Sequence, residues 1–231
     1  MKSNFSLIDF IKSTFYLIAI SFVFISGLLN APESSLRDTN SIVDYLVKTS
    51  SIPNSVTAVI LGSRLFDTIG EVIVFTVAGL GVKILLSSED SESRLVGVQD
   101  PVIINLLDFI ALLIGFLAVE LAIRGHLSPG GGFAAGVAGA TSITLFMVSG
   151  RLQKIENYYS KFNAAIVEKF AVVVFIVVAT MSFASVVIPE SLFASIPQTI
   201  YIPILNITCG LKVTIGAWSV IRLFIIKRGI I

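Results

Sequence analysis

The sequence predicts an all-α integral membrane protein, a bundle of about six transmembrane helices. Of its 231 residues, 55% are hydrophobic and only 13% are charged, and the mean hydropathy is +0.94. The apolar residues also gather in long runs, and about 20 such residues in a helix cross the roughly 30 Å of hydrocarbon in a bilayer. Composition and run length together therefore indicate a membrane-spanning helical bundle.

Six apolar windows have the length of a span. They are Phe10 to Leu29, Leu65 to Leu86, Val102 to Ile123, Phe133 to Val148, Phe170 to Ile188 and Ile200 to Ile226. The first window follows Lys2 and Lys12 but has Leu29 where a signal peptidase needs a small residue, so we read it as a retained anchor. The fourth is the shortest and directly follows a polar turn, so we expect it to form a tight hairpin with the third.

The loops carry an uneven distribution of basic residues, which predicts orientation. One side collects Lys2, Lys12, Arg94, Arg151, Lys154, Lys161, Lys169, Lys227 and Arg228, and the other has Arg37, Lys48, Arg64 and Arg124. With an even number of spans, both termini should be cytoplasmic in a plasma-membrane protein. The segment from Asn30 to Ser55 would lie outside, where Ile42, Val43, Leu46 and Val47 have helical spacing. They predict either an amphipathic interfacial helix or a solvated loop helix.

Charged residues within the predicted spans are the main functional candidates, because a charge in hydrocarbon persists only with a partner or a hydrated path. Arg64, Asp67 and Glu71 are three and four residues apart and should share one helix face. Arg64 with Asp67 suits an interfacial ion pair. Glu71 lies one turn deeper and suits either an ion-translocation group or a buried hydrogen-bonding group.

Three more candidates follow along the chain. Glu120 precedes Arg124 by four residues and is expected to form a structural ion pair with it. Lys212 stands well inside the last window, between Gly210 and Gly216, and its amine either has a buried partner or snorkels to an interface. Asp108 and Lys83 should lie near the inner headgroups with no translocation role.

A glycine-rich turn, RGHLSPGGGFAAGVAGA, joins the third and fourth windows. It lacks the lysine of a phosphate loop and the preceding strand of a dinucleotide loop, so nucleotide binding is not expected. Pro129, Gly130 and Gly131 set the chain direction, and Gly132 with Gly136 forms a GxxxG pair for close helix packing. His126, the one histidine, is a candidate titrating loop residue.

No motif in the sequence supports catalysis. It has no CxxC cluster, no Ser-His-Asp set, no metal-ligand cluster and no basic stripe interleaved with aromatics. We therefore expect no enzyme activity of its own, no cofactor, no metal and no nucleic acid.

Two segments resemble parts of the Mrp (Mnh) multisubunit cation/proton antiporters. GHLSPGGGFAAGVAGA and NITCGLKVTIGA are similar to the B subunit, with Leu127 where that family usually has Asn. DYLVKTSSIPNSVTAVILGSRLFDTIGEVIVFTVAGLGV resembles the C-terminal end of the A subunit, with Leu65 where Gly is usual. The resemblance divides the chain into an A-like segment of residues 1–95 and a B-like domain of residues 96–231.

The resemblance implies an ion-translocation subunit of a large complex rather than an enzyme. Its expected partners are other Mrp-like membrane subunits, the lipid bilayer, sodium ion or proton, and a hydrogenase-like or sulfane-reductase-like redox enzyme, as in archaeal membrane-bound respiratory complexes. In this context Glu71 and Asp67 supply carboxylates at a subunit contact, and Lys212 biases the pKa of acidic groups. The alternatives are a stand-alone Mrp exchanger subunit, a purely structural scaffold, and an independent small transporter, which the absence of an internal repeat disfavours.

Overall fold

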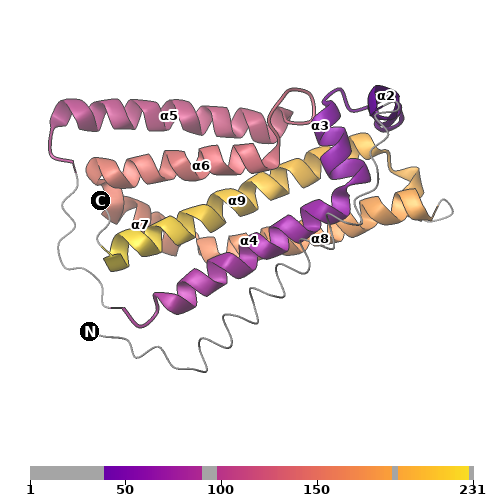
Figure 1. The fold of residues 1–231 in the computed structure, drawn as a ribbon. Coiled ribbons are helices and arrows are strands. Elements are labelled where there is room, and N and C mark those ends of the chain that lie inside the picture. The colour runs from indigo at the N-terminus through magenta and orange to yellow at the C-terminus, as the bar shows by residue number, and fades with distance from the viewer. Residues whose placement is uncertain (1–38, 90–97, 189–191, 229–231) are drawn as a thin grey trace, which may run out of the picture. The chain divides into compact units, whose positions relative to one another are not determined.

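The computed structural model describes residues 39–89, 98–188 and 192–228, and within these segments it consists of helices joined by turns and loops (Figure 1). Its elements in chain order are α2 (Thr39–Ser50), α3 (Ser55–Ala58), the π-helix η1 (Val59–Ser63), α4 (Leu65–Leu85), α5 (Pro101–Arg124), α6 (Gly132–Phe146), the π-helix η2 (Met147–Arg151), α7 (Leu152–Lys161), α8 (Ala164–Val187), the 3-10 helix η3 (Leu192–Ser195) and α9 (Gln198–Arg228). The predicted all-α membrane bundle is confirmed.

Five segments of the described chain are long and apolar enough to cross a membrane. They are Leu65–Leu85, Pro101–Arg124, Gly132–Lys161, Ala164–Val187 and Gln198–Lys227. Each overlaps one of the predicted windows over most of its length, so a multi-pass membrane protein is confirmed. The remaining window, Phe10 to Leu29, lies outside the described residues.

Helix α9 is the central element of the compact unit formed by residues 42–231. It packs against α6, α8 and α4, while α5 packs mainly against α6 (Figure 1). In the most apolar window of α9, 44% of residues are buried, compared with 11% in α4 and in α5. The outer helices therefore leave most of their apolar surface for lipid or neighbouring subunits.

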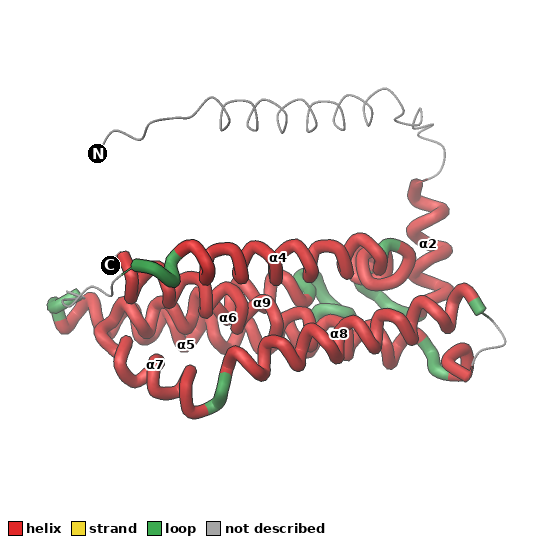
Figure 2. Tube along the Cα trace, turned by 90° about the horizontal axis from the view of Figure 1, so that it is seen from below, coloured by secondary structure: helices red, strands yellow, loops and turns green. Residues whose placement is uncertain are grey.

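The α5–α6 hairpin forms as expected, and polar caps fix where its first helix begins. The Asp100 side chain accepts a hydrogen bond from Val102 N at 2.8 Å, and Pro101 occupies the first helical position. Figure 2 shows α5, α6 and α9 running alongside one another in the second view. The tight hairpin brings the glycine-rich turn to the end of the bundle at which α3 lies.

Two helices extend beyond their predicted boundaries. After α6 the chain bends at Gly150, whose φ of +88° is accessible to glycine, and continues as the polar helix α7. Helix α8 begins at Ala164, six residues before the predicted start at Phe170. The charges of Glu168 and Lys169 end the apolar run in the sequence, yet both residues are helical, and Glu168 forms an ion pair with Lys212 of α9.

The predicted amphipathic segment before α3 is a helix, α2. Val43, Leu46 and Val47 are half-buried, whereas Asp44 and Tyr45 are exposed. Val47 packs on the core cluster that contains Ile52, Leu61 and Val72 from the segments that follow. The helix is confirmed, and its position at the membrane interface stays a prediction.

Candidate functional site

Lys212 forms an ion pair in the interior of the bundle. The residue is 0% exposed, and its Nζ lies 2.5 Å from Oε1 of Glu168 on α8. The same Nζ lies 4.8 Å from the centre of the Phe75 ring on α4, a cation–π distance. Lys212 therefore joins three helices and does not snorkel to an interface.

Gly216, one turn after Lys212, leaves the space that this pair needs. A Cβ at Gly216 would lie 2.9 Å from Lys212 Nζ, 2.9 Å from Glu168 Oε1 and 2.7 Å from Phe75 Cε1. Any side chain there would displace the pair. In an interior of low dielectric, the close approach of Lys212 and Glu168 strengthens the attraction between their charges. This attraction offsets the free energy that both charges lose when they leave water.

A cavity of about 380 Å³ borders the carboxylate of Glu168. It lies between α4, α8 and α9, and its apolar lining includes Leu80 and Val173. Its polar lining residues are Thr76, Lys83, Tyr159, Glu168, Lys169 and Ser219. The buried ion pair thus adjoins a partly polar space on the side of the Glu168 carboxylate.

The acidic residues of α4 are exposed, and neither forms an ion pair with Lys212. Arg64 and Asp67 form an exposed ion pair with a 2.6 Å separation between Nη2 and Oδ2. Glu71 is exposed as well, and it makes no hydrogen bond or ion pair with any described residue. The three residues share one face, as their spacing predicts, and all three are exposed.

The remaining sequence candidates in α5 also lie on its surface. Glu120 pairs with Arg124 at 3.4 Å, and both side chains are more than half exposed. An exposed pair of this kind contributes about 0–1 kcal/mol to stability. Deeper in the fold, Asp108 of α5 binds Arg151 and accepts a 2.7 Å hydrogen bond from Ser149, and so fixes the bend between α6 and α7.

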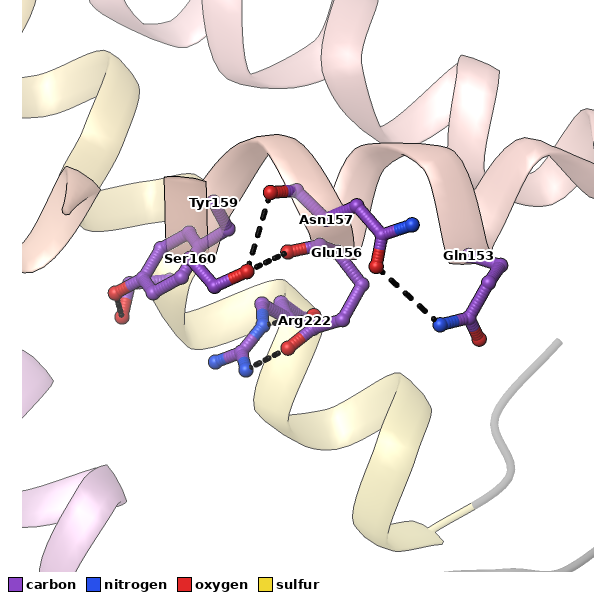
Figure 3. Close-up of polar contacts among 7 residues, drawn as sticks. Gln153, Glu156, Asn157, Tyr159, Ser160 and Arg222 are labelled. Atoms are coloured by element: carbon purple, nitrogen blue, oxygen red, sulfur yellow. Dashed lines mark hydrogen bonds and ion pairs between the residues drawn. The ribbon is translucent and has the colours of Figure 1, made fainter. Parts of the chain in front are cut away.

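A further ion pair holds α7 against α9. Figure 3 shows Glu156 of α7 and Arg222 of α9, joined by two hydrogen bonds, one from Nε and one from Nη2 of Arg222. The guanidinium carbon of Arg222 lies 4.3 Å from the centre of the Tyr159 ring, which packs edge-on against Trp218 at 4.9 Å. This bidentate pair locks the polar helix α7 to the bundle.

The glycine-rich loop is held by three polar side chains from outside it. Asn54 Nδ2 donates to Gly125 O at 2.8 Å and to Ser128 O at 2.7 Å, and Thr57 Oγ1 donates to Gly125 O at 2.8 Å. Asn206 of α9, 0% exposed, donates from Nδ2 to the carbonyls of Leu121 and Ala122 at 3.2 and 2.7 Å. These bonds satisfy the last carbonyls of α5, which have no partner within the helix.

His126 is part of this clamp through its backbone. Its carbonyl accepts a hydrogen bond from Asn54 N at 3.3 Å, while its buried Nδ1 has no partner among the described atoms. Pro129 is exposed. The next two residues, Gly130 and Gly131, have φ values of +144° and +105°, which side chains rarely tolerate, and turn the chain into α6.

The glycines of α6 form its contact with α9. A Cβ at Gly132 would lie 2.5 Å from Asn206 O, and one at Gly136 would lie 2.3 Å from Val213 Cβ. The two backbones therefore approach as closely as small residues allow, which is typical of membrane helix pairs.

Among the ion-translocation candidates, only Lys212 is buried, whereas Asp67, Glu71 and Glu120 lie on exposed faces. Sequence reasoning missed Glu168, because its charge put it in a predicted loop. It also missed Asn206, although an Asn inside an apolar span is the same signal that singled out Lys212. Within the described residues, no group of three or more His, Cys, Asp or Glu side chains could hold a metal ion.

Comparisons with known proteins agree with this architecture. Residues 102–219, which are 118 of the 231 residues, match the model of a family described as a domain related to the MnhB subunit of Na+/H+ antiporter. A solved chain from the membrane-bound sulfane sulfur reductase (MBS), an archaeal respiratory membrane complex, has the same fold, with a TM-score of 0.59 and 19% identity, over 94% of this chain and 98% of that one. No curated protein matches the chain. On the family match, the chain belongs to the family of membrane proteins with a domain related to the MnhB subunit of Na+/H+ antiporters.

Proposed function

We propose that this chain contributes to sodium or proton translocation as a subunit, without catalytic residues, of a multisubunit antiporter-like module. The observation that carries the proposal is the ion pair between Lys212, which is 0% exposed, and Glu168. An ionisable residue within a span is a functional hypothesis by default, because its presence in hydrocarbon is costly. Family membership supports the same function.

In this proposal Lys212 acts by its charge. Its ammonium lies 2.5 Å from the Glu168 carboxylate, so a change in the charge of either group changes the electric field inside the bundle. Glu71 and Asp67 have a different part, since both are exposed on α4. They offer oxygen ligands, which a hard cation such as sodium prefers, at the surface where a neighbouring subunit would pack.

The test is to replace Glu71 with Gln in the assembled complex and measure sodium-dependent transport in membrane vesicles. We expect transport to be abolished while the complex assembles normally. Asp44→Asn is the control, because Asp44 is an exposed acid of α2, outside the spanning helices. Wild-type transport in an assembled Glu71→Gln complex would remove Glu71 from the pathway.

We further propose that the module is coupled to a respiratory redox enzyme and lies in the plasma membrane, with both termini in the cytoplasm. The fold shared with a chain of the archaeal sulfane sulfur reductase complex supports this assembly, as does the resemblance of residues 1–95 to the A subunit ahead of a B-like domain at 96–231. Mass spectrometry of proteins that co-purify with the tagged chain tests the proposal. If antiporter subunits co-purify with iron–sulfur or nickel proteins, the complex is a redox-driven pump. If antiporter subunits co-purify alone, it is a stand-alone exchanger, and a chain that purifies without partners contradicts both proposals.

One observation favours a second candidate, a structural scaffold. The charge of Lys212 is compensated within the chain by Glu168 and the Phe75 ring. If the pair only joins α8 to α9, neutral substitution of Lys212 lowers thermal stability and leaves transport intact. If the pair takes part in translocation, transport falls even in variants that assemble fully.

A further inference from the structure

We propose that the cavity between α4, α8 and α9 binds an anionic phospholipid, with its phosphate held by Lys83 and Lys169. This binding site is independent of the proposed translocation function. It would make the chain, and any complex that contains it, selective for acidic lipid at one membrane face.

The walls of the cavity suit the hydrocarbon of a lipid. Its volume is about 380 Å³, and Leu80, Val172, Val173 and Val220 form much of the lining. Leu80 on α4 and Val173 on α8 are 56% and 57% exposed, so the cavity is open along the outward surfaces of both helices. An acyl chain lying between α4 and α8 would cover these side chains.

The charges of the lining call for an anion. Lys83 and Lys169 are exposed, and neither makes a hydrogen bond or ion pair with a described residue. The one acidic lining residue, Glu168, is already neutralised by Lys212. Within the described part of the chain, two ammonium groups without a polar partner therefore line a cavity whose one carboxylate is paired.

The position of these lysines matches the depth of a headgroup. Lys83 lies in the last turn of α4, and Lys169 lies near the start of α8. Both lysines line the same cavity, so the C-terminal end of one span and the N-terminal part of the other lie together there. The Tyr159 and Ser219 hydroxyls, 3.2 Å apart, line the same cavity and hydrogen-bond to each other, which leaves one O–H of the pair to donate to a phosphate oxygen. Basic pockets between membrane helices are recognised binding sites for acidic lipid headgroups.

Native mass spectrometry of the delipidated full-length chain in detergent tests the site, with dioleoyl phosphatidylglycerol and dioleoyl phosphatidylcholine as probes. We expect tighter binding of phosphatidylglycerol. The double variant Lys83→Gln/Lys169→Gln should weaken it about thirtyfold, because each basic residue near an acidic lipid contributes roughly fivefold. Lys154→Gln/Lys161→Gln, which removes two lysines outside the cavity lining, is the matched control and should bind like the wild type.

A second variant tests the cavity and not the charge. A Cβ at Gly79 would lie 3.6 Å from Val220 Cγ2, an ordinary contact, so Gly79→Phe can place its ring in the cavity. It should lose phosphatidylglycerol binding while Gly81→Phe, outside the lining, retains it. The proposal would be overturned if the two lipids bound equally, or if Lys83→Gln/Lys169→Gln or Gly79→Phe bound phosphatidylglycerol like the wild type. It would also be overturned if a control variant lost as much binding as its test variant, or if millimolar inorganic phosphate displaced the lipid.

Discussion

Removing the charge of Lys212 alone should destabilise the bundle more than removing the whole ion pair. The side chains of Lys212 and Glu168 are 1% and 20% exposed, so Lys212→Met leaves a carboxylate without its partner in a largely dry site. Breaking a buried pair typically costs 3–5 kcal/mol. The partial exposure of Glu168 places this site near the lower limit, about 3 kcal/mol, or roughly 6–12 °C in Tm for a chain of this size.

The double variant Lys212→Met/Glu168→Leu removes both charges and keeps apolar volume at each position. It should recover most of the loss, because replacing a buried pair with apolar residues is often close to neutral. Thermal unfolding in detergent can be followed by the fluorescence of Trp218, the one tryptophan, which is 8% exposed and lies on α9 six residues after Lys212. Lys154→Met, which removes an exposed lysine outside the cavity lining, is the control and should change stability by less than about 0.5 kcal/mol.

The test of this reasoning is whether the effects of Lys212→Met and Glu168→Leu on the free energy of unfolding are additive. A double variant that is as unstable as the sum of the two single variants would mean that Lys212 and Glu168 do not interact energetically. That result would refute the ion pair as the element that joins α8 to α9.

Three further predictions concern the packing around this site. Gly136→Ala should lower the free energy of unfolding by about 1–3 kcal/mol, because its Cβ would lie 2.3 Å from Val213 Cβ. Gly81→Ala is the control for thermal unfolding and should be tolerated, because a Cβ there meets no atom within 4 Å. Asn206→Leu should lower the free energy of unfolding by about 2 kcal/mol, because it leaves the carbonyls of Leu121 and Ala122 without their side-chain donor. Hydrogen exchange in the glycine-rich loop should become faster in this variant and stay unchanged in the control Asn157→Leu. Glu156→Gln should detach α7 and expose Trp218 to aqueous quenchers, and unchanged quenching would contradict the clamp.

Much of the fold follows from the local sequence. A run of about 20 apolar residues has one stable arrangement in a bilayer, the helix, because it satisfies every backbone group internally. That is why the windows starting at Leu65, Val102, Phe133, Phe170 and Ile200 all coincide with helices. The same argument fails for α7 and for the start of α8, because hydropathy cannot recognise charged helical residues that find partners elsewhere in the fold.

By itself, the sequence determined the class of protein, the spans, the close approach at Gly132 and Gly136, and the presence of a charge inside the last helix. The tertiary structure decided what that charge does, since Glu168 is 44 residues away from Lys212 in the sequence. It also decided that Glu71 is exposed and that Asn54 and Asn206 hold the glycine-rich loop by hydrogen bonds. The physical reason is that apolar burial depends on residues within one helix, whereas the free energy of a buried polar group depends on the atoms that another helix brings beside it.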